Sequence, residues 1–151
     1  MKATEILHDD HQALSRLLTG LATAKRAATR ARFLADLKRE LGVHAAVEEK
    51  LFYPVMKSIS NGNGAAIVAE ALEEREEVKG LLAQLAALDP RDEDFPLVSR
   101  ILRQAVEDHS EEQESRMFPL LEEHMSDERL EALGRRITAL KSLGSKGTAS
   151  R

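Results

Sequence analysis

The chain repeats a histidine-centred motif at a fixed separation, and this repeat limits the possible folds more than any other feature. The first copy is His44-Ala-Ala-Val-Glu48, and the second is His109-Ser-Glu-Glu-Gln113. In both copies a proline follows ten positions after the histidine, directly after an aromatic residue. The two copies lie 65 residues apart, so that Glu48 corresponds to Gln113.

A second pair of segments repeats at almost the same offset. Residues 9–21 align with residues 73–85 at a separation of 64, and the apolar positions match. In each segment two acidic residues precede the aligned position, which is His11 in the first and Arg75 in the second. The pattern predicts a tandem duplication of one helical hairpin.

Apolar residues recur at three- and four-residue spacing along most of the chain, which is typical of amphipathic helices. We expect an all-α, up-down-up-down four-helix bundle with pseudo-two-fold internal symmetry, followed by a short fifth helix. Pro54 should bend or break its helix just before the proline. A single domain is predicted over 1–143, with a disordered tail over 144–151. The four long helices are expected at about 4–27, 29–59, 65–88 and 95–125, with a turn at 60–64 and a loop at 89–94.

Composition narrows the classes of function. Aromatic residues make up 3% of the chain and tryptophan is absent, so the core must be built from small aliphatic side chains. The absence of cysteine excludes disulfides and thiolate metal sites. A net charge of −4 argues against a nucleic-acid partner. No apolar run is long enough for a membrane span and no signal peptide is evident, so a cytoplasmic protein without a membrane partner is expected.

The spacing of His44 and Glu48 places an imidazole and a carboxylate on one face of a helix, one turn apart. Bundle proteins build carboxylate-bridged iron and manganese sites from such inward-facing side chains. The duplication should bring His11, Arg75 and His109 to the same level of the core from three other helices.

These residues, with Phe52-Tyr53-Pro54 and Phe118-Pro119, resemble the hemerythrin-like, HHE cation-binding domains over roughly residues 4–125. The resemblance implies a four-helix bundle that holds a non-haem di-iron centre. It also implies oxygen binding, oxygen or nitric-oxide sensing, iron handling or peroxide chemistry. The family pattern has a histidine where this chain has Arg75 and a second bridging glutamate where it has Gln113.

The two departures predict an incomplete di-iron site, because a guanidinium has no lone pair to donate and an amide is a poor ligand. The resemblance carries over four metal ligands, which are His11, His44, Glu48 and His109. One reading is a single iron, manganese or zinc ion centred on His11, His44 and Glu48, with His109 as a further ligand and dioxygen or nitric oxide as the small ligand. The alternative is a metal-free interaction module in which Arg75 pairs with Glu48 and Gln113 bonds to either. A weak peroxidase or oxidase is a further alternative, although no separate acid–base set favours an enzyme, and a protein partner is not indicated.

Several polar residues near the motifs are expected to lie outside the site. Tyr53 is predicted to pack at the end of the bundle, with a role as a donor in the site as the alternative. Arg75 could instead extend to solvent among the acids near it in sequence. Glu114 is predicted to be solvated, and Glu74 is predicted to belong to a charged helix face. His8 is predicted to lie at the surface or just outside the ligand residues.

Overall fold

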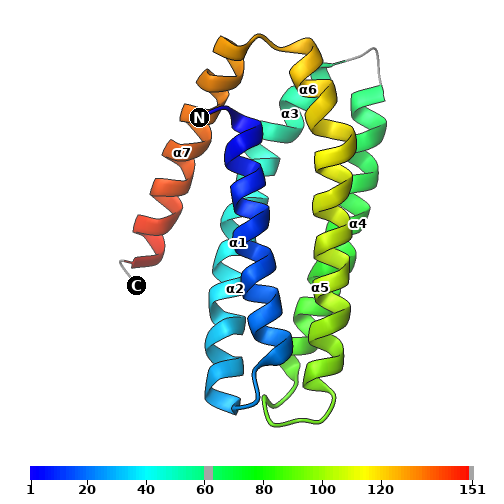
Figure 1. Cartoon of the computed structure of the whole chain (residues 1–151), viewed down its shortest axis with the longest axis vertical. Coiled ribbons are helices and arrows are strands. Elements are labelled where there is room, and N and C mark those ends of the chain that lie inside the picture. The colour runs from blue at the N-terminus through cyan, green and yellow to red at the C-terminus, as the bar shows by residue number, and fades with distance from the viewer. Residues whose placement is uncertain (60–62, 150–151) are drawn as a thin grey trace.

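The computed structural model describes the backbone of residues 1–59 and 63–149, with side chains through residue 144, and these residues form helices without any strand (Figure 1). No helix in this part of the chain combines the length and apolar character needed to cross a membrane. The elements are α1 (Ala3–Thr23), α2 (Ala27–Val47), η1 (Glu48–Phe52), α3 (Tyr53–Ser58), α4 (Asn63–Ala87), α5 (Phe95–Glu112), η3 (Gln113–Met117), α6 (Phe118–His124) and α7 (Asp127–Ala149).

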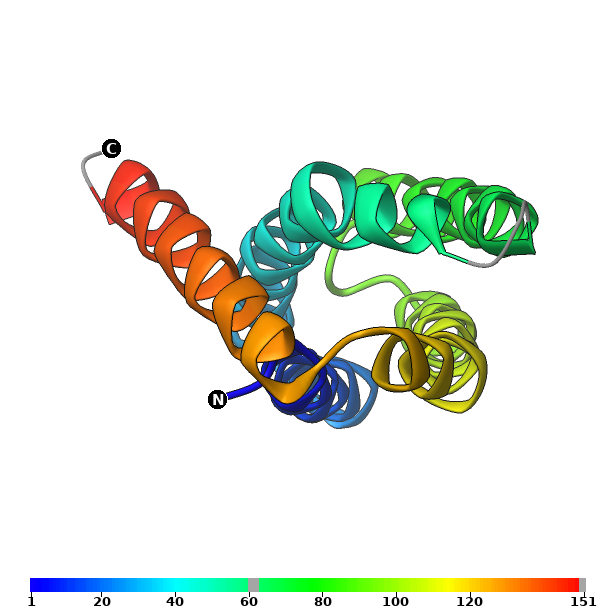
Figure 2. The same ribbon diagram turned by 90° about the horizontal axis from the view of Figure 1, so that it is seen from above.

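The four long helices form the predicted up-down-up-down bundle, as the views from the side and from above show (Figures 1 and 2). Helix α1 packs against α2 and α5, and α4 packs against α5. The first helix ends earlier than predicted, at Thr23, where Arg30 Nε donates to the carbonyl of Ala24 at 2.9 Å. The predicted turn at 60–64 lies partly outside the described residues, and α4 begins at Asn63.

Two π-helical turns, η1 and η3, interrupt the second and fourth helices at equivalent positions of the duplication. Each turn comes just before a proline, Pro54 or Pro119. In an α-helix a proline has no N–H to donate, and its ring clashes with the backbone carbonyl four residues earlier. The backbone N–H of Tyr53 bonds to the carbonyl of Glu48, five positions earlier, and the second copy has the same bond. The predicted break before Pro54 is therefore a wider helical turn.

Two apolar clusters fill the bundle, one toward each end. The first gathers η1, α3, η3, α6 and α7 around Phe52 and Met56, which are fully buried. The second gathers the opposite ends of α1, α2, α4 and α5 around Leu37, Phe95 and Leu102. The buried polar side chains of the two repeated motifs lie between these clusters.

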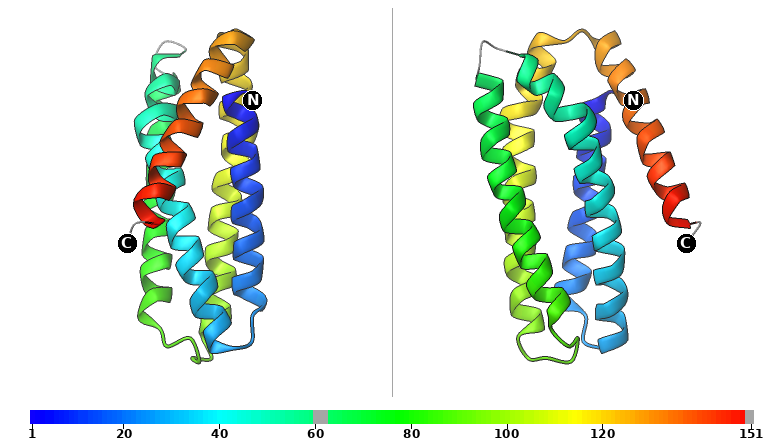
Figure 3. Two further views of the ribbon diagram at one scale, coloured as in Figure 1. Left: turned by 90° about the vertical axis from the view of Figure 1, so that its left-hand side faces the viewer. Right: turned by 180° about the vertical axis from the view of Figure 1, so that it is seen from behind.

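The fifth helix is longer than the short helix predicted, because α7 continues to Ala149. It packs against α1 and α2 outside the four-helix bundle (Figures 2 and 3). Gly144, where the sequence suggested a disordered tail, lies so close to α2 that an added Cβ would be 3.3 Å from Cγ2 of Val43. This glycine permits close packing of α7 on α2, and the backbone is helical through Ala149. The disordered tail over 144–151 stays a prediction, and residues 150–151 lie outside the described part.

Candidate functional site

The structure brings together the side chains that the repeats single out. His11 comes from α1, His44 from α2 and His109 from α5, while Glu48 and Gln113 each begin a π-helical turn. All five are buried, with exposed fractions between 0% and 8%. The predicted convergence of the motifs at one level of the core is therefore present in the fold.

The carboxylate of Glu48 is the centre of this polar layer. Tyr53 donates its hydroxyl to Oε2 at 2.8 Å, and Arg75 Nη2 donates to Oε1 at 3.2 Å. Gln113 Nε2 also donates to Oε2. Arg75 thus points into the bundle, with 13% of its side chain exposed, and it does not extend to solvent. The sequence prediction that Arg75 would pair with Glu48 matches this geometry.

The π-helical turn explains why Tyr53 reaches the site. Tyr53 follows Glu48 by five residues, which would place it on a different face of an α-helix. The wider turn returns it to nearly the same face, where its ring also lies under the guanidinium of Arg75 at 5.4 Å. Burial and the nearby charge of Glu48 raise the pKa of Tyr53, so this phenol stays a hydrogen-bond donor.

Gln113 links the carboxylate to His11. Its Nε2 contacts Glu48 and the Tyr53 hydroxyl, the latter at 3.2 Å, while its Oε1 lies 2.9 Å from His11 Nε2. The other ring nitrogen of His11 lies 3.2 Å from a carboxylate oxygen of Glu114. An amide at position 113 can therefore contact the acid on one side and the imidazole on the other without adding charge.

The two remaining imidazoles leave nitrogen atoms without partners. His44 Nε2 and His109 Nε2 both face Oε2 of Glu48, at 3.6 and 3.4 Å. Within the described residues, both ring nitrogens of His44 and Nδ1 of His109 are buried and have no hydrogen-bond partner. Buried polar atoms are nearly always partnered, so Nε2 of His44, which faces Glu48, is a candidate position for a ligand.

Two acidic residues stand behind these histidines in a symmetric arrangement. Asp10 Oδ2 lies 3.7 Å from His44 Nδ1, and Glu74 Oε2 lies 3.7 Å from His109 Nδ1. Asp10 directly precedes His11, and Glu74 directly precedes Arg75 at the aligned position of the repeat. The duplication therefore also includes the acids that face the two histidines. Glu74 is therefore not only part of a charged surface, since it also faces His109. The matching pairs of acids in the two repeats could have predicted this position.

Lys141 connects the fifth helix to this layer by pairing with Asp10. Burial raises the pKa of Asp10, but the imidazole of His44 and the ammonium of Lys141 outweigh it and hold the pKa below its ordinary value. Asp10 therefore stays ionised behind His44. No motif pointed to Lys141, because the contact joins residues from opposite ends of the chain.

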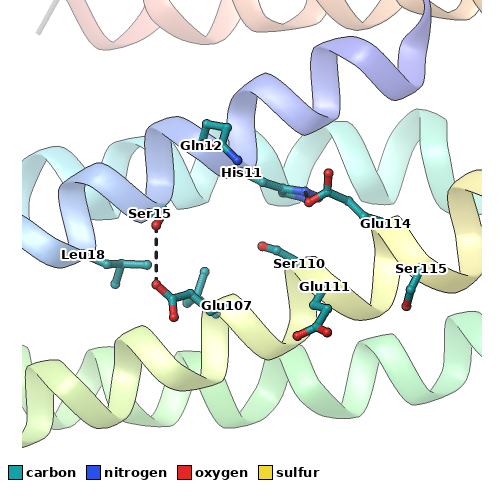
Figure 4. Close-up of a pocket in the computed structure, with 10 residues that line it drawn as sticks. His11, Gln12, Ser15, Leu18, Glu107, Ser110, Glu111, Glu114 and Ser115 are labelled. Atoms are coloured by element: carbon teal, nitrogen blue, oxygen red, sulfur yellow. Dashed lines mark hydrogen bonds and ion pairs between the residues drawn. The ribbon is translucent and has the colours of Figure 1, made fainter.

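Glu114 and His8 lie at the solvent edge of the site, on the face between α1 and α5. His8 Nδ1 pairs with one oxygen of Glu114. The other oxygen of Glu114 faces His11 (Figure 4). A cavity of about 400 Å³ reaches this face, and its lining includes three acids, Glu107, Glu111 and Glu114. The prediction that Glu114 would be solvated misses its contact with the buried His11. His8 lies at the surface, as one of its two predicted positions had it, and it reaches the site only through Glu114.

The environment of His11 predicts a pH-dependent stability. Burial, together with the charge of His44, lowers the pKa of His11 to about 4. An unfolded histidine titrates near about 6.5, so between these values the unfolded chain binds a proton that the folded chain does not. The free energy of unfolding should therefore fall, by up to about 3 kcal/mol, as the pH of the metal-free protein is lowered from 6.5 to 4. The raised pKa of His44 does not oppose this loss, because His44 is protonated in both states below 6.5.

Urea unfolding at several pH values measures this effect. The variant His11→Gln should show a clearly shallower dependence on pH than the parent. The matched control is His124→Gln, since His124 is exposed on α6 and should leave the parent slope unchanged. Equal slopes in all three proteins would contradict the assignment to His11.

Comparisons with known proteins agree with this fold. The family model for the hemerythrin HHE cation binding domain matches residues 2–121. A DNA nickase from Nostoc sp. is 28% identical over 142 residues, which cover 94% of this chain and 40% of that protein, so the chain spans less than half of the relative's length. The crystal structure of a hemerythrin HHE cation binding domain-containing protein from Mycobacterium kansasii superposes with a TM-score of 0.88 at 22% identity, covering 99% of this chain and 91% of that one. Because the family model spans most of its residues, the chain belongs to the hemerythrin HHE cation binding domain family.

Proposed function

We propose that the protein binds at most one divalent metal ion, held by His44, His109 and Glu48. The observation that carries the proposal is Nε2 of His44, which is buried beside Glu48 and has no hydrogen-bond partner among the described residues. Both histidines direct Nε2 toward the same oxygen of Glu48. His11, also predicted as a ligand, contacts Gln113 and Glu114 and would adjoin this ion.

The distances support an ion of ordinary size at this point. A metal with bonds of about 2.1 Å keeps neighbouring ligand atoms about 3.0–3.4 Å apart. The two Nε2–Oε2 separations, 3.4 and 3.6 Å, are close to that range. Asp10 and Glu74 would orient the two imidazoles from behind, as outer carboxylates do at histidine-rich sites.

The same layer does not fit a second ion. Arg75 occupies the position of the third-helix histidine, and its fixed positive charge lies 3.2 Å from Glu48. Gln113 supplies an amide where the family pattern has a bridging carboxylate. Within the part of the chain that the structure describes, no three His, Asp or Glu groups are gathered into a ready metal cluster. Binding of an ion would therefore require the Glu48 carboxylate to give up one of the hydrogen bonds that it accepts.

The donor set also limits the chemistry. Two imidazoles and one carboxylate suit Fe(II), Mn(II) or Zn(II), and the family relationship favours iron. A bound iron would supply a redox-active Lewis acid for dioxygen or nitric oxide, which makes sensing or iron handling the proposed role. Tyr53 and Gln113 would hold the Glu48 carboxylate in a fixed orientation. The nickase activity named for the Nostoc relative is not part of this proposal, because the chain spans 40% of that protein and carries a net charge of −4.

A specific contact favours a second candidate function, a metal-free interaction module. The Arg75–Glu48 pair already compensates the buried carboxylate, and such a pair makes the layer tolerable without an ion. Metal content separates the two candidates. A metal-binding protein should contain an ion that is lost when His44 is replaced, whereas a metal-free module should contain none.

Elemental analysis of protein grown with iron supplementation tests the proposal. We expect no more than one tightly bound ion per chain in the parent and strong loss of that ion in His44→Ala. The control His124→Ala removes an exposed histidine and should retain the parent stoichiometry. Two ions per chain would contradict the proposal, and a fully folded parent without any ion would support the metal-free module.

A further inference from the structure

A second cavity, of about 240 Å³, opens on the opposite side of the polar layer, between residues of α2 and α4. Both helices lie on the face seen from behind the bundle (Figure 3). The cavity runs from the exposed Lys38 and Lys79 inward to the buried His44 and His109. It is separate from the cavity beside Glu114 that Figure 4 shows.

The walls of this cavity are mainly aliphatic. Its apolar lining comes from all four long helices and consists of Leu14, Leu41, Ala45, Val78, Leu82 and Val106. A volume of 240 Å³ is about eight times the space of one water in the liquid, which is room for a chain of about six to eight carbon atoms. Binding an aliphatic chain here would remove apolar surface of both partners from water.

The charges around the cavity favour an anion. Its charged lining residues are three cations, Lys38, Arg75 and Lys79, and one acid, Glu48. Because Arg75 pairs with Glu48, the two lysines at the mouth are the charges left for a ligand. Lys79 has only an exposed contact of 3.4 Å with Glu76. The cavity beside Glu114 has the opposite character, because its described lining contains three acids and neither lysine nor arginine.

A glycine in the wall keeps this entrance wide. Gly42 lies within α2, where glycine costs about 1 kcal/mol relative to alanine. A Cβ added to Gly42 would meet no atom within 4 Å, so a side chain at this position would extend into open space at the cavity. Position 42 therefore offers a way to fill the cavity without disturbing the polar layer.

We propose that this cavity binds an aliphatic monocarboxylate of about six to eight carbons. The hydrocarbon chain lies against the leucine and valine lining, and the carboxylate stays at the mouth beside Lys38 and Lys79. This orientation avoids burying a second carboxylate next to Glu48, which would be costly. The site does not depend on a bound metal ion, since its apolar wall and its two lysines lie outside the proposed ligand set.

Calorimetric titration of chelator-treated, metal-free protein with hexanoate tests the proposal. We expect saturable binding of hexanoate and octanoate, no measurable binding of acetate, and binding of hexanol at least tenfold weaker than that of hexanoate. The double variant Lys38→Met/Lys79→Met should bind hexanoate at least tenfold more weakly. Equal affinity for hexanol and hexanoate would overturn the assignment to a carboxylate.

A pair of glycine variants locates the site. Gly42→Leu should abolish hexanoate binding by filling the cavity while keeping the helical circular dichroism of the parent. Gly80→Leu is the matched control, because Gly80 is also a helical glycine with open space around its Cβ but does not line the cavity. Retained binding in Gly42→Leu, or no binding by the folded parent, would overturn the proposal without bearing on metal content.

Discussion

Replacing Arg75 with methionine should lower the free energy of unfolding of the metal-free protein by about 3–5 kcal/mol. The substitution keeps much of the volume of the side chain but removes the charge that faces Glu48 at 3.2 Å. The carboxylate of Glu48 is 3% exposed, so it cannot recover this interaction from water. For a chain of 151 residues the melting temperature should fall by roughly 6–20 °C.

The control for this prediction is Arg116→Met. Arg116 also pairs with acids, Glu70 and Glu112, but 46% of its side chain is exposed. Surface pairs contribute only about 0–1 kcal/mol, so this variant should melt close to the parent. Adding Glu48→Gln to Arg75→Met should recover much of the loss, because the unpaired charge is then gone. A melt of Arg75→Met that overlays the parent would show that Arg75 does not compensate Glu48.

The sequence was most informative where the duplication could be read directly. The offsets of 64 and 65 residues predicted the bundle, the shared level of the motifs and the pairing of Arg75 with Glu48. Each of these depends on which face of a helix a residue occupies, and helical spacing determines that face. The same reasoning, applied to the acids that precede His11 and Arg75, would have predicted that Asp10 faces His44 and that Glu74 faces His109.

Other features depend on details that spacing alone does not specify. Tyr53 reaches Glu48 because a π-helical turn contains more residues than an α-helical turn, so that the fifth residue returns to nearly the same face. Pro54 indicates a disruption of the helix without giving its form. Glu114 joins His8 to His11 because α1 and α5 pack at one particular rotation. Helix α7 continues through Gly144, close to Val43, although a glycine in isolation favours the end of a helix.

The largest gain in metal binding is expected from the double change Arg75→His with Gln113→Glu. It restores both ligands that the family pattern contains and this chain lacks, on side chains that already point into the polar layer. We expect metal content to rise toward two ions per chain, measured by elemental analysis after growth with iron. Excess Mn(II) or Fe(II) at about 1,000 times its dissociation constant should stabilise the variant by about 4 kcal/mol per site.

The single change Gln113→Glu separates the roles of the two positions. It places a second carboxylate against Glu48 while Arg75 remains, so two acids share one cation in a buried layer. In the absence of metal we expect this variant to be less stable than the parent. The carboxylates of Glu48 and of the new glutamate would be adjacent, and each opposes the ionisation of the other. It should also gain less from added metal than the double variant does.

The matched control makes the same chemical changes on the surface, as Arg116→His with Gln104→Glu. Both residues are exposed, so metal content and stability should stay near those of the parent. If the core double variant folds and yet binds no more metal than the parent, then Arg75 and Gln113 do not limit the number of metal ions that the site binds. If its metal content doubles, the two departures together removed one ion, since losing a cation and an anionic ligand at once leaves the charge of the layer nearly balanced.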